Sequence, residues 1–227
     1  MSRSNGSAEP KFRRAAPDAR RGELIAATLA CLSKLGHEGV SVRRISAEAG
    51  VSMGLITHHF RSIDSLVAAA YRSLAEGLLS RSREPALAIA GDPLESLHAF
   101  FAASFAPHAL DPAIFRTWLV FWSRVPHSAE LRAVRNLTYR ESCATLATLL
   151  TRLRRAPGVP AFRLGPAATG LAALMDGLWV ELSLSPSSFE PRQAVALCDD
   201  WVRALAAGAF PALRRAPGIT GTSSAPR

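Results

Sequence analysis

Apolar residues recur at spacings of three and four along most of the chain, which is the pattern of helices with one buried face. The first stripe predicts a helix over residues 18–35. Its apolar positions are Leu24, Ile25, Leu29, Leu32 and Leu35. Gly36 follows directly, and a glycine just past the last apolar position is a common helix stop, because it adopts a positive φ without a Cβ penalty.

Two short helices follow, joined by Gly50-Val51-Ser52. Ser41 and Ser52 stand where N-cap residues are expected, and the second of these helices spans 53–59. Ile45, Ile56 and Phe60 are predicted to pack this pair against the first helix. A tight glycine turn between two short helices is the helix-turn-helix pattern, whose second helix enters the major groove of DNA.

Proline and glycine divide the remainder into helices. A connecting helix is predicted at 63–82, followed by helices at about 93–106, 112–125, 128–155, 166–184 and 190–207. Since no segment alternates as a strand does, the predicted fold is all-α. The expected domains are a flexible basic arm (1–16), a helix-turn-helix domain (17–62), the connecting helix (63–82), a ligand-binding and dimerisation domain (83–210) and a disordered tail (211–227).

Charge narrows the class of partner. The 227 residues include 27 Lys and Arg against 18 Asp and Glu, a net charge of +9, which favours an anionic partner such as nucleic acid. The three cysteines lie far apart, which excludes a disulfide-stapled secreted domain. The most apolar stretch, 167–184, is interrupted by Asp176 and Glu181, so a cytoplasmic protein without a membrane span is expected.

The run from Gly36 to Phe60 resembles the DNA-binding domain of TetR-family repressors. The resemblance rests on Ala-Gly-Val-Ser in the turn, a glycine two residues later and His-Phe at the helix end, and it covers about residues 18–80. It implies an all-α dimer that binds a palindromic double-stranded operator and takes a small-molecule effector in its C-terminal bundle.

The resemblance also implies roles for particular residues. Ser41, Arg43 and Arg44 would reach a phosphate or a base edge, and Leu55 would contact a thymine methyl group. The full set of implied DNA contacts is Ser41, Arg43, Arg44, Ser52, Met53, Gly54, Leu55, Thr57, His58, His59 and Arg61.

Two positions depart from the family pattern: Thr57 replaces a frequent tyrosine and Ile63 a frequent lysine. Phosphate binding would then rely more on Arg61 and on arginines near the N-terminus. These are Arg13, Arg14, Arg20 and Arg21. A merely solubilising arm is the alternative.

The C-terminal half resembles one branch of that family, the BetI-type regulators of choline-to-glycine-betaine genes. Thr117–Trp122, Arg135-Asn136, Gly170–Val180 and Thr57-His58-His59 carry this resemblance, which then extends over most of residues 18–207. It implies that the effector is choline or a related quaternary ammonium compound.

Aromatic residues at helical spacing fit such a cation, which aromatic faces and nearby negative charge hold. Phe115, Trp118 and Trp122 share one helix face, and Asp176 and Trp179 lie three apart on another helix. The candidate ligand residues are Phe101, Phe105, Phe115, Trp118, Trp122, Asn136, Tyr139, Asp176 and Trp179. Such aromatics are more often ordinary core, and that alternative stays open.

Wide apolar faces on the helices at 166–184 and 190–207 are predicted to pair with their copies in a homodimer. Their leucines and valines could instead pack on the bundle of one chain.

Other functions fit less well. A lipophilic effector is one alternative, and an anionic effector bound by Arg116, Arg124 and Arg140 is another. A helical enzyme lacks a nucleophile elbow, a phosphate loop or a metal signature, so no catalytic residue and no cofactor is expected. Adjacent His58 and His59 point in different directions on a helix, which argues against a metal site.

Overall fold

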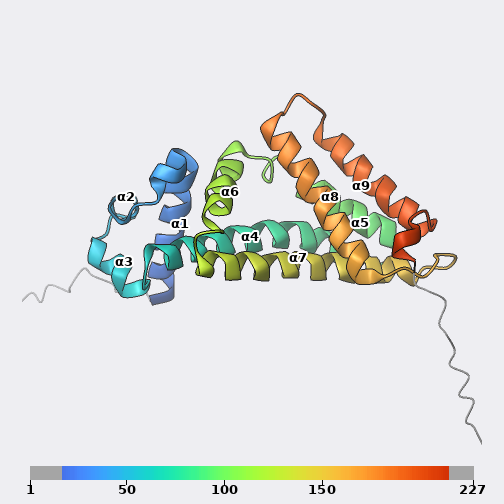
Figure 1. Ribbon diagram of the computed structural model, residues 1–227, viewed down its shortest axis with the longest axis horizontal. Helices are drawn as coiled ribbons and strands as arrows, with labels where there is room; N and C mark the ends of the chain where they lie inside the picture. The colour runs from blue at the N-terminus through green and yellow to red at the C-terminus, as the bar shows by residue number, and fades with distance from the viewer. Residues whose placement is uncertain (1–16, 215–227) are drawn as a thin grey trace, which may run out of the picture.

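The computed structural model describes residues 17–214, so the expectations for the arm (1–16) and for the tail from 215 onward lie outside the described residues. Residues 211–214 were predicted to belong to the disordered tail, but they form a 3-10 turn (Pro211–Leu213) and pair with Phe162 and Arg163. Within residues 17–214 the structure consists of helices joined by short loops (Figure 1). The α-helices are α1 (Pro17–Leu35), α2 (Val42–Glu48), α3 (Met53–His59), α4 (Ile63–Ala88), α5 (Pro93–Ser104), α6 (Pro112–Arg124), α7 (Ala129–Arg154), α8 (Leu164–Leu184) and α9 (Pro191–Ala206). Two 3-10 turns, η1 (Gly36–Gly39) and η2 (Pro211–Leu213), complete the described elements. The all-α prediction is confirmed.

Helices α1, α2 and α3 form a small unit around one core. Its fully packed members are Leu24, Ala27, Cys31, Ile45, Ile56, Phe60 and Leu66. Gly36 and Gly50 have φ of 57° and 63°, so both turns use the left-handed conformation that only glycine adopts without strain. The predicted packing of Ile45, Ile56 and Phe60 is therefore confirmed.

The caps of these helices differ from the prediction. Ser41 and Ser52 occupy N-cap positions with extended backbone, but neither hydroxyl makes the capping hydrogen bond. Instead, Ser62 and Ser65 form a reciprocal capping box at the start of α4. Sequence analysis missed this box because the third helical position holds a serine in place of the usual glutamate.

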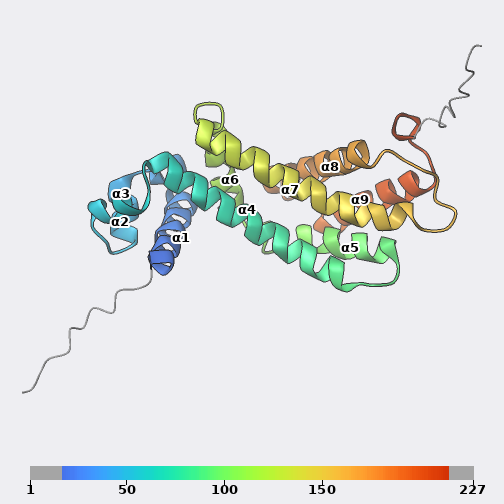
Figure 2. The ribbon, with the colours of Figure 1, turned by 90° about the horizontal axis from the view of Figure 1, so that it is seen from below.

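Helix α4 continues to Ala88, past residue 82 where the prediction ended it. Ser82 and Ala86 are buried, which gives this last stretch a packing face. Pro85 lies in the last turn on the exposed side, where it removes one backbone hydrogen bond at an already fraying helix end. Helix α4 thus runs from the N-terminal unit alongside α7 to the far end of the molecule (Figure 2).

The larger core lies among α4, α5, α7, α8 and α9. Leu171 and Leu182 of α8 and Val202 and Leu205 of α9 are buried within this core. Much of the apolar face predicted for dimerisation therefore packs inside one chain, which was the alternative. By length and composition alone, α8 is the one helix of residues 17–214 apolar enough to cross a membrane, and one of its faces packs against α7 and α9.

Candidate functional site

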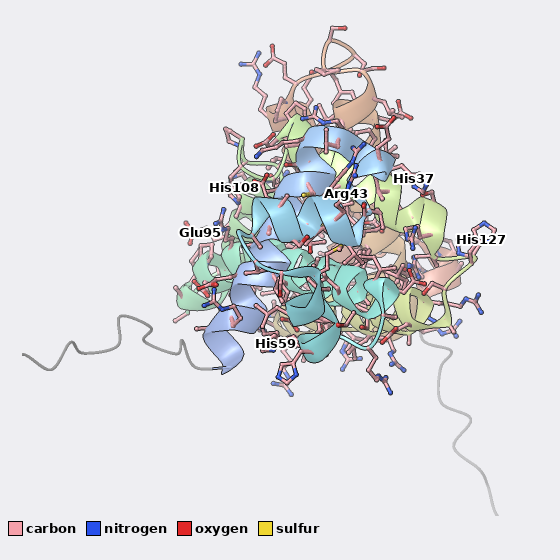
Figure 3. The ribbon with its side chains drawn as sticks, turned by 90° about the vertical axis from the view of Figure 1, so that its left-hand side faces the viewer. His37, Arg43, His59, Glu95, His108 and His127 are labelled. Atoms are coloured by element: carbon pink, nitrogen blue, oxygen red, sulfur yellow. The ribbon has the colours of Figure 1, made fainter. Side chains whose placement is uncertain are left out.

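The N-terminal residues of α3 form an exposed surface. Ser52, Met53 and Gly54 are exposed, and Met53 retains 55% of its accessible surface although it is apolar. Arg43 of α2 is exposed beside them. Figure 3 looks onto this end of the molecule, with Arg43 near the top of the unit and His59 pointing away from it at the bottom. An exposed α3 is free to enter a DNA groove.

Other residues expected to contact DNA have partners in the protein or are partly buried. Arg44 lies 3.5 Å from the Glu38 carboxylate, measured from Nη2 to Oε2. The Thr57 hydroxyl donates to the carbonyl of Gly54 at 2.9 Å. Leu55 was expected to point outward, but it is half-buried. Contact of Leu55 with a base would therefore involve only part of its side chain.

Arg20 and Arg21 belong to α1, not to a flexible arm. The Arg21 guanidinium lies 4.2 Å from the centre of the Phe60 ring and donates to the His59 carbonyl at 3.1 Å. Arg20 pairs with Glu23. Arg21 thereby ties α1 to the end of α3, while Arg61 and His58 stay exposed. Arg13 and Arg14 lie outside the described residues.

The histidines do not form a metal site with neighbouring groups. The His58 and His59 rings meet edge to face, with centroids 5.2 Å apart. Between residues 17 and 214, no cluster of three or more His, Cys, Asp or Glu side chains is suited to a metal ion.

A cavity of about 220 Å³ lies in the larger domain, between α4, α5, α6, α7 and α8. Trp118 and Trp122 of α6 and Trp179 of α8 line it together. Their ring centroids are 6.0 Å (118 to 122), 6.4 Å (118 to 179) and 6.3 Å (122 to 179) apart. Three indoles from two helices thus form one aromatic cluster at the cavity wall.

Hydrogen bonds and ring contacts hold these indoles in place. The Trp179 Nε1 donates to the carbonyl of Ala109 at 2.9 Å, and Phe115 packs against the same indole at 5.4 Å. Tyr71 of α4 meets Trp118 edge to face at 4.7 Å. Since these contacts come from three helices and the loop before α6, the aromatic wall is set before any ligand arrives.

Six of the nine predicted ligand residues line the cavity: Phe105, Trp118, Trp122, Tyr139, Asp176 and Trp179. Phe101, Phe115 and Asn136 do not. Phe101 is fully buried in the core, because its neighbour Phe100 takes the cavity-facing position on α5. Phe115 supports Trp179 from behind, and Asn136 is exposed. Ligand binding by the six residues stays a prediction.

The wall also contains residues that the sequence did not suggest, among them Tyr71, Phe100 and Arg135. Arg135 lies four positions before Tyr139 on α7, and its guanidinium stacks 4.7 Å from the centre of the Tyr139 ring. That spacing places both on one helix face, which is the signal that could have identified Arg135 once Tyr139 was chosen.

Asp176 is the acidic group of the cavity wall. Loss of solvation raises the pKa of Asp176 above its ordinary value, and the positive charge of Arg135 partly offsets this. By accessible surface, however, the Asp176 residue is exposed to solvent, so the desolvation of its carboxylate is only partial. Burial likewise raises the pKa of Tyr71, whose phenol therefore stays neutral.

The three arginines considered for an anionic ligand are not in the wall. Arg116 of α6 donates from Nε to the carbonyl of Ser33 in α1 at 3.0 Å, and Arg124 of α6 pairs with Asp64 at the start of α4. Arg140 is exposed on α7. Helix α6 therefore has aromatic residues on the cavity, while Arg116 contacts α1 and Arg124 contacts the start of α4.

A helix-turn-helix unit joined by a long helix to a larger all-α domain with an internal cavity defines a class of bacterial transcriptional regulator. The chain belongs to the TetR family of these regulators. Residues 24–70 match the family of bacterial regulatory proteins of TetR type, and residues 93–207 match the BetI-type transcriptional repressor C-terminal family. The protein is therefore a TetR-family transcriptional regulator of BetI type.

Individual relatives agree with this assignment. The chain is 30% identical over 188 residues to the HTH-type transcriptional regulator BetI of Burkholderia ambifaria (strain MC40-6), covering 83% of this chain and 94% of that one. A Pseudomonas aeruginosa PAO1 protein described as a transcriptional regulator has a TM-score of 0.82 and 42% identity, with 90% and 98% of the two chains covered. A regulator from Saccharomonospora viridis, solved in complex with choline, shares the fold at a TM-score of 0.67 and 23% identity, with 83% and 97% covered.

Proposed function

We propose that this protein is a cytoplasmic, dimeric repressor that releases its operator when a quaternary ammonium compound, choline or a close relative, binds the cavity. The observation that carries this proposal is the convergence of Trp118, Trp122 and Trp179 with Asp176 on one cavity wall. An ordinary core would bury the indoles against each other. Here Trp122 lines the cavity and keeps 37% of its surface accessible.

The chemistry of the wall suits a cation that has no N–H group. Such a cation is attracted to aromatic faces within about 6 Å of their centroids and to nearby negative charge. The indole centroids lie 6.0–6.4 Å apart, so the three rings form one continuous aromatic surface for an ammonium head. Asp176 supplies the charge. The choline complex of the Saccharomonospora viridis protein supports the proposal, since that protein shares this fold.

A route from the cavity to the DNA-binding unit supports effector control. Tyr71 and Leu78 of α4 line the cavity, and the same helix begins directly after the helix-turn-helix. Helix α6 contributes Trp118 and Trp122 to the wall and pairs with Asp64 through Arg124. A dimer would present its α3 helices to half-sites about 34–36 Å apart, and a ligand that favours another spacing would release DNA.

Isothermal titration with choline tests the proposal. The control ligand is 3,3-dimethyl-1-butanol, which has the shape of choline without its charge. We expect heat with choline and little with the alcohol, and loss of choline binding in Trp118→Ala. Leu119→Ala is the matched control, since Leu119 follows on α6 but is exposed and does not line the cavity. Equal binding of both ligands, or none of choline, would contradict a cation site.

A further inference from the structure

Arg135 is an unusual part of a wall built for a cation. It is half-buried on α7, its guanidinium rests on the Tyr139 ring, and it lines the cavity with the three indoles. Among the described residues, no carboxylate pairs with it and no acceptor receives a hydrogen bond from its side chain. The five N–H donors of the guanidinium therefore have no acceptor in the described part of the protein, and a ligand carboxylate in the cavity would bind them directly.

Asp176 is likewise without a partner in the described part of the protein, but it carries the opposite charge. Its carboxylate lies on α8 in the same wall, and no described side chain forms an ion pair or hydrogen bond with it. Arg135 and Asp176 are close enough to influence each other electrostatically but do not form a salt bridge. The empty cavity thus presents one positive and one negative group, each without a direct partner in the protein.

Charge balance then decides which ligand fits best. A simple cation would pair with Asp176 and leave Arg135 unmatched in a cavity whose net charge is already near zero. A ligand with one charge of each sign would pair with both groups at once, through charge-assisted hydrogen bonds to the guanidinium and charge attraction to the carboxylate. The planar guanidinium fork matches a carboxylate with two parallel hydrogen bonds.

We propose that the effector is a small zwitterion, with its quaternary ammonium group among Trp118, Trp122 and Trp179 beside Asp176 and its carboxylate on Arg135. This inference rests on the proposed function and narrows its ligand class. The cavity of about 220 Å³ is below the range of drug-sized sites, about 300–1,000 Å³, so a compact molecule fits. Stacking on Tyr139 holds the guanidinium in one orientation before the ligand binds.

Titration of matched ligand pairs tests this inference. The pairs are glycine betaine with its methyl ester and γ-butyrobetaine with its methyl ester, so that each pair differs only in the anionic group. Phosphocholine tests whether a phosphate replaces the carboxylate. We expect at least one free acid to bind about tenfold or more tightly than its ester, the size of one charged hydrogen-bonded contact.

Variants assign the effect to Arg135. Arg135→Met should bind the methyl esters as tightly as the unchanged protein does, but it should no longer prefer the free acids over their esters. Arg135→Lys should retain part of this preference. Arg140→Met is the control, because Arg140 is exposed on the same helix outside the cavity. Thermal unfolding checks that each variant is folded.

Each other outcome is decisive. Equal affinity for acid and ester, a preference that survives in Arg135→Met, or tighter binding of phosphocholine would overturn the carboxylate-binding zwitterion site while leaving a cation site in place. Absence of binding by all of these compounds and by choline would instead overturn the proposed function itself.

Discussion

At the scale of single residues, Asp176 is the acidic group of the cavity wall. Its raised pKa means that the charged carboxylate lowers the stability of the fold, although the same charge would attract a cationic ligand. Below the ordinary carboxyl pKa both folded and unfolded states are protonated, so Asp176 does not affect stability. As pH rises toward the raised pKa, the unfolded state loses its proton first and stability falls. Above the raised pKa the ionised Asp176 lowers the free energy of unfolding by its full amount, and this loss of stability persists at neutral pH.

Asp176→Asn is therefore expected to raise the melting temperature at pH 7, with a gain that shrinks toward about pH 4. The same change should weaken choline binding by about tenfold or more, because the attracting charge is lost. In the unchanged protein, choline affinity should fall as pH falls through the raised pKa. Thermal unfolding and titration calorimetry across pH measure both effects.

Glu181→Gln is the matched control, since Glu181 is exposed on α8 outside the cavity. A lower melting temperature for Asp176→Asn at pH 7 would show that the carboxylate has a stabilising partner, contrary to this account.

Spacing along one helix face placed Trp118 and Trp122 on the cavity wall but not Phe115, and it could not separate two adjacent aromatics; ligand binding by these residues stays a prediction. Trp118 and Trp122 were chosen by spacing on a single helix, and both line the cavity. Phe100 and Phe101 are adjacent aromatics, so spacing alone could not decide which one faces the cavity. Arg135 was missed because a charged residue on an amphipathic helix usually faces solvent.

At the scale of elements, the packing of α1 against η1 depends on Gly39. A Cβ at this position would lie 2.4 Å from the Cys31 carbonyl oxygen and 2.7 Å from its carbonyl carbon. These are backbone atoms of α1, which cannot move aside without shifting the helix. Gly39→Ala should therefore lower the free energy of unfolding by about 1–3 kcal/mol, as overpacking typically does.

Urea unfolding measures this effect, with Gly22→Ala as the control. Gly22 is exposed within α1 and a Cβ there would meet no atom within 4 Å, so the alanine should stabilise by about 0.5–1 kcal/mol. Equal stability of Gly39→Ala and the unchanged protein would refute the tight contact.

The contact between α6 and α4 is the element-scale link between effector and DNA. Arg124→Met removes the pair with Asp64, whose carboxylate keeps a favourable place in the first turn of α4. We expect choline affinity and operator affinity to change little when each is measured alone. The ratio of operator affinities without and with choline, typically about 5–150-fold for such coupling, should fall toward one.

Fluorescence anisotropy of labelled operator with and without choline gives this ratio. Arg140→Met again serves as the control. If Arg124→Met keeps the same ratio of operator affinities as the unchanged protein, the effect of choline on operator binding passes through α4 alone.

Some helix boundaries could be predicted from the sequence and others could not. The bounds of α3 agree with the predicted 53–59, because Gly50, Ser52 and Phe60 mark its ends through backbone conformation and burial. The end of α4 was missed because breaks at proline and glycine set the prediction, whereas packing of Ser82 and Ala86 extends the helix. Local signals fix turns, and tertiary contacts decide how far a helix continues.

At the scale of the whole molecule, binding to a two-fold operator requires a dimer. Apolar side chains that remain exposed on α8 and α9 are available for its interface. Leu184 and Leu197 keep 59% and 50% of their surface accessible. Leu197→Glu is expected to give a folded monomer of 24.2 kDa and to weaken operator binding by about a hundredfold, since both half-sites would no longer be held together.

Light scattering coupled to size-exclusion chromatography measures the mass. Leu87→Glu is the control, because Leu87 is similarly exposed, at 47%, but lies on α4. A stable monomer of the unchanged protein at micromolar concentration would contradict dimerisation.

The central claim, that one protein couples a quaternary ammonium compound to DNA release, is tested most directly by operator binding in the presence of effector. The duplex is one that the protein itself selects from a random library, and its affinity is measured by anisotropy as choline or glycine betaine is added. We predict a palindromic sequence whose affinity falls at least fivefold with effector, about the lower end of typical coupling, and does not fall in Trp118→Ala. Unchanged affinity at saturating concentrations of both compounds would contradict the account.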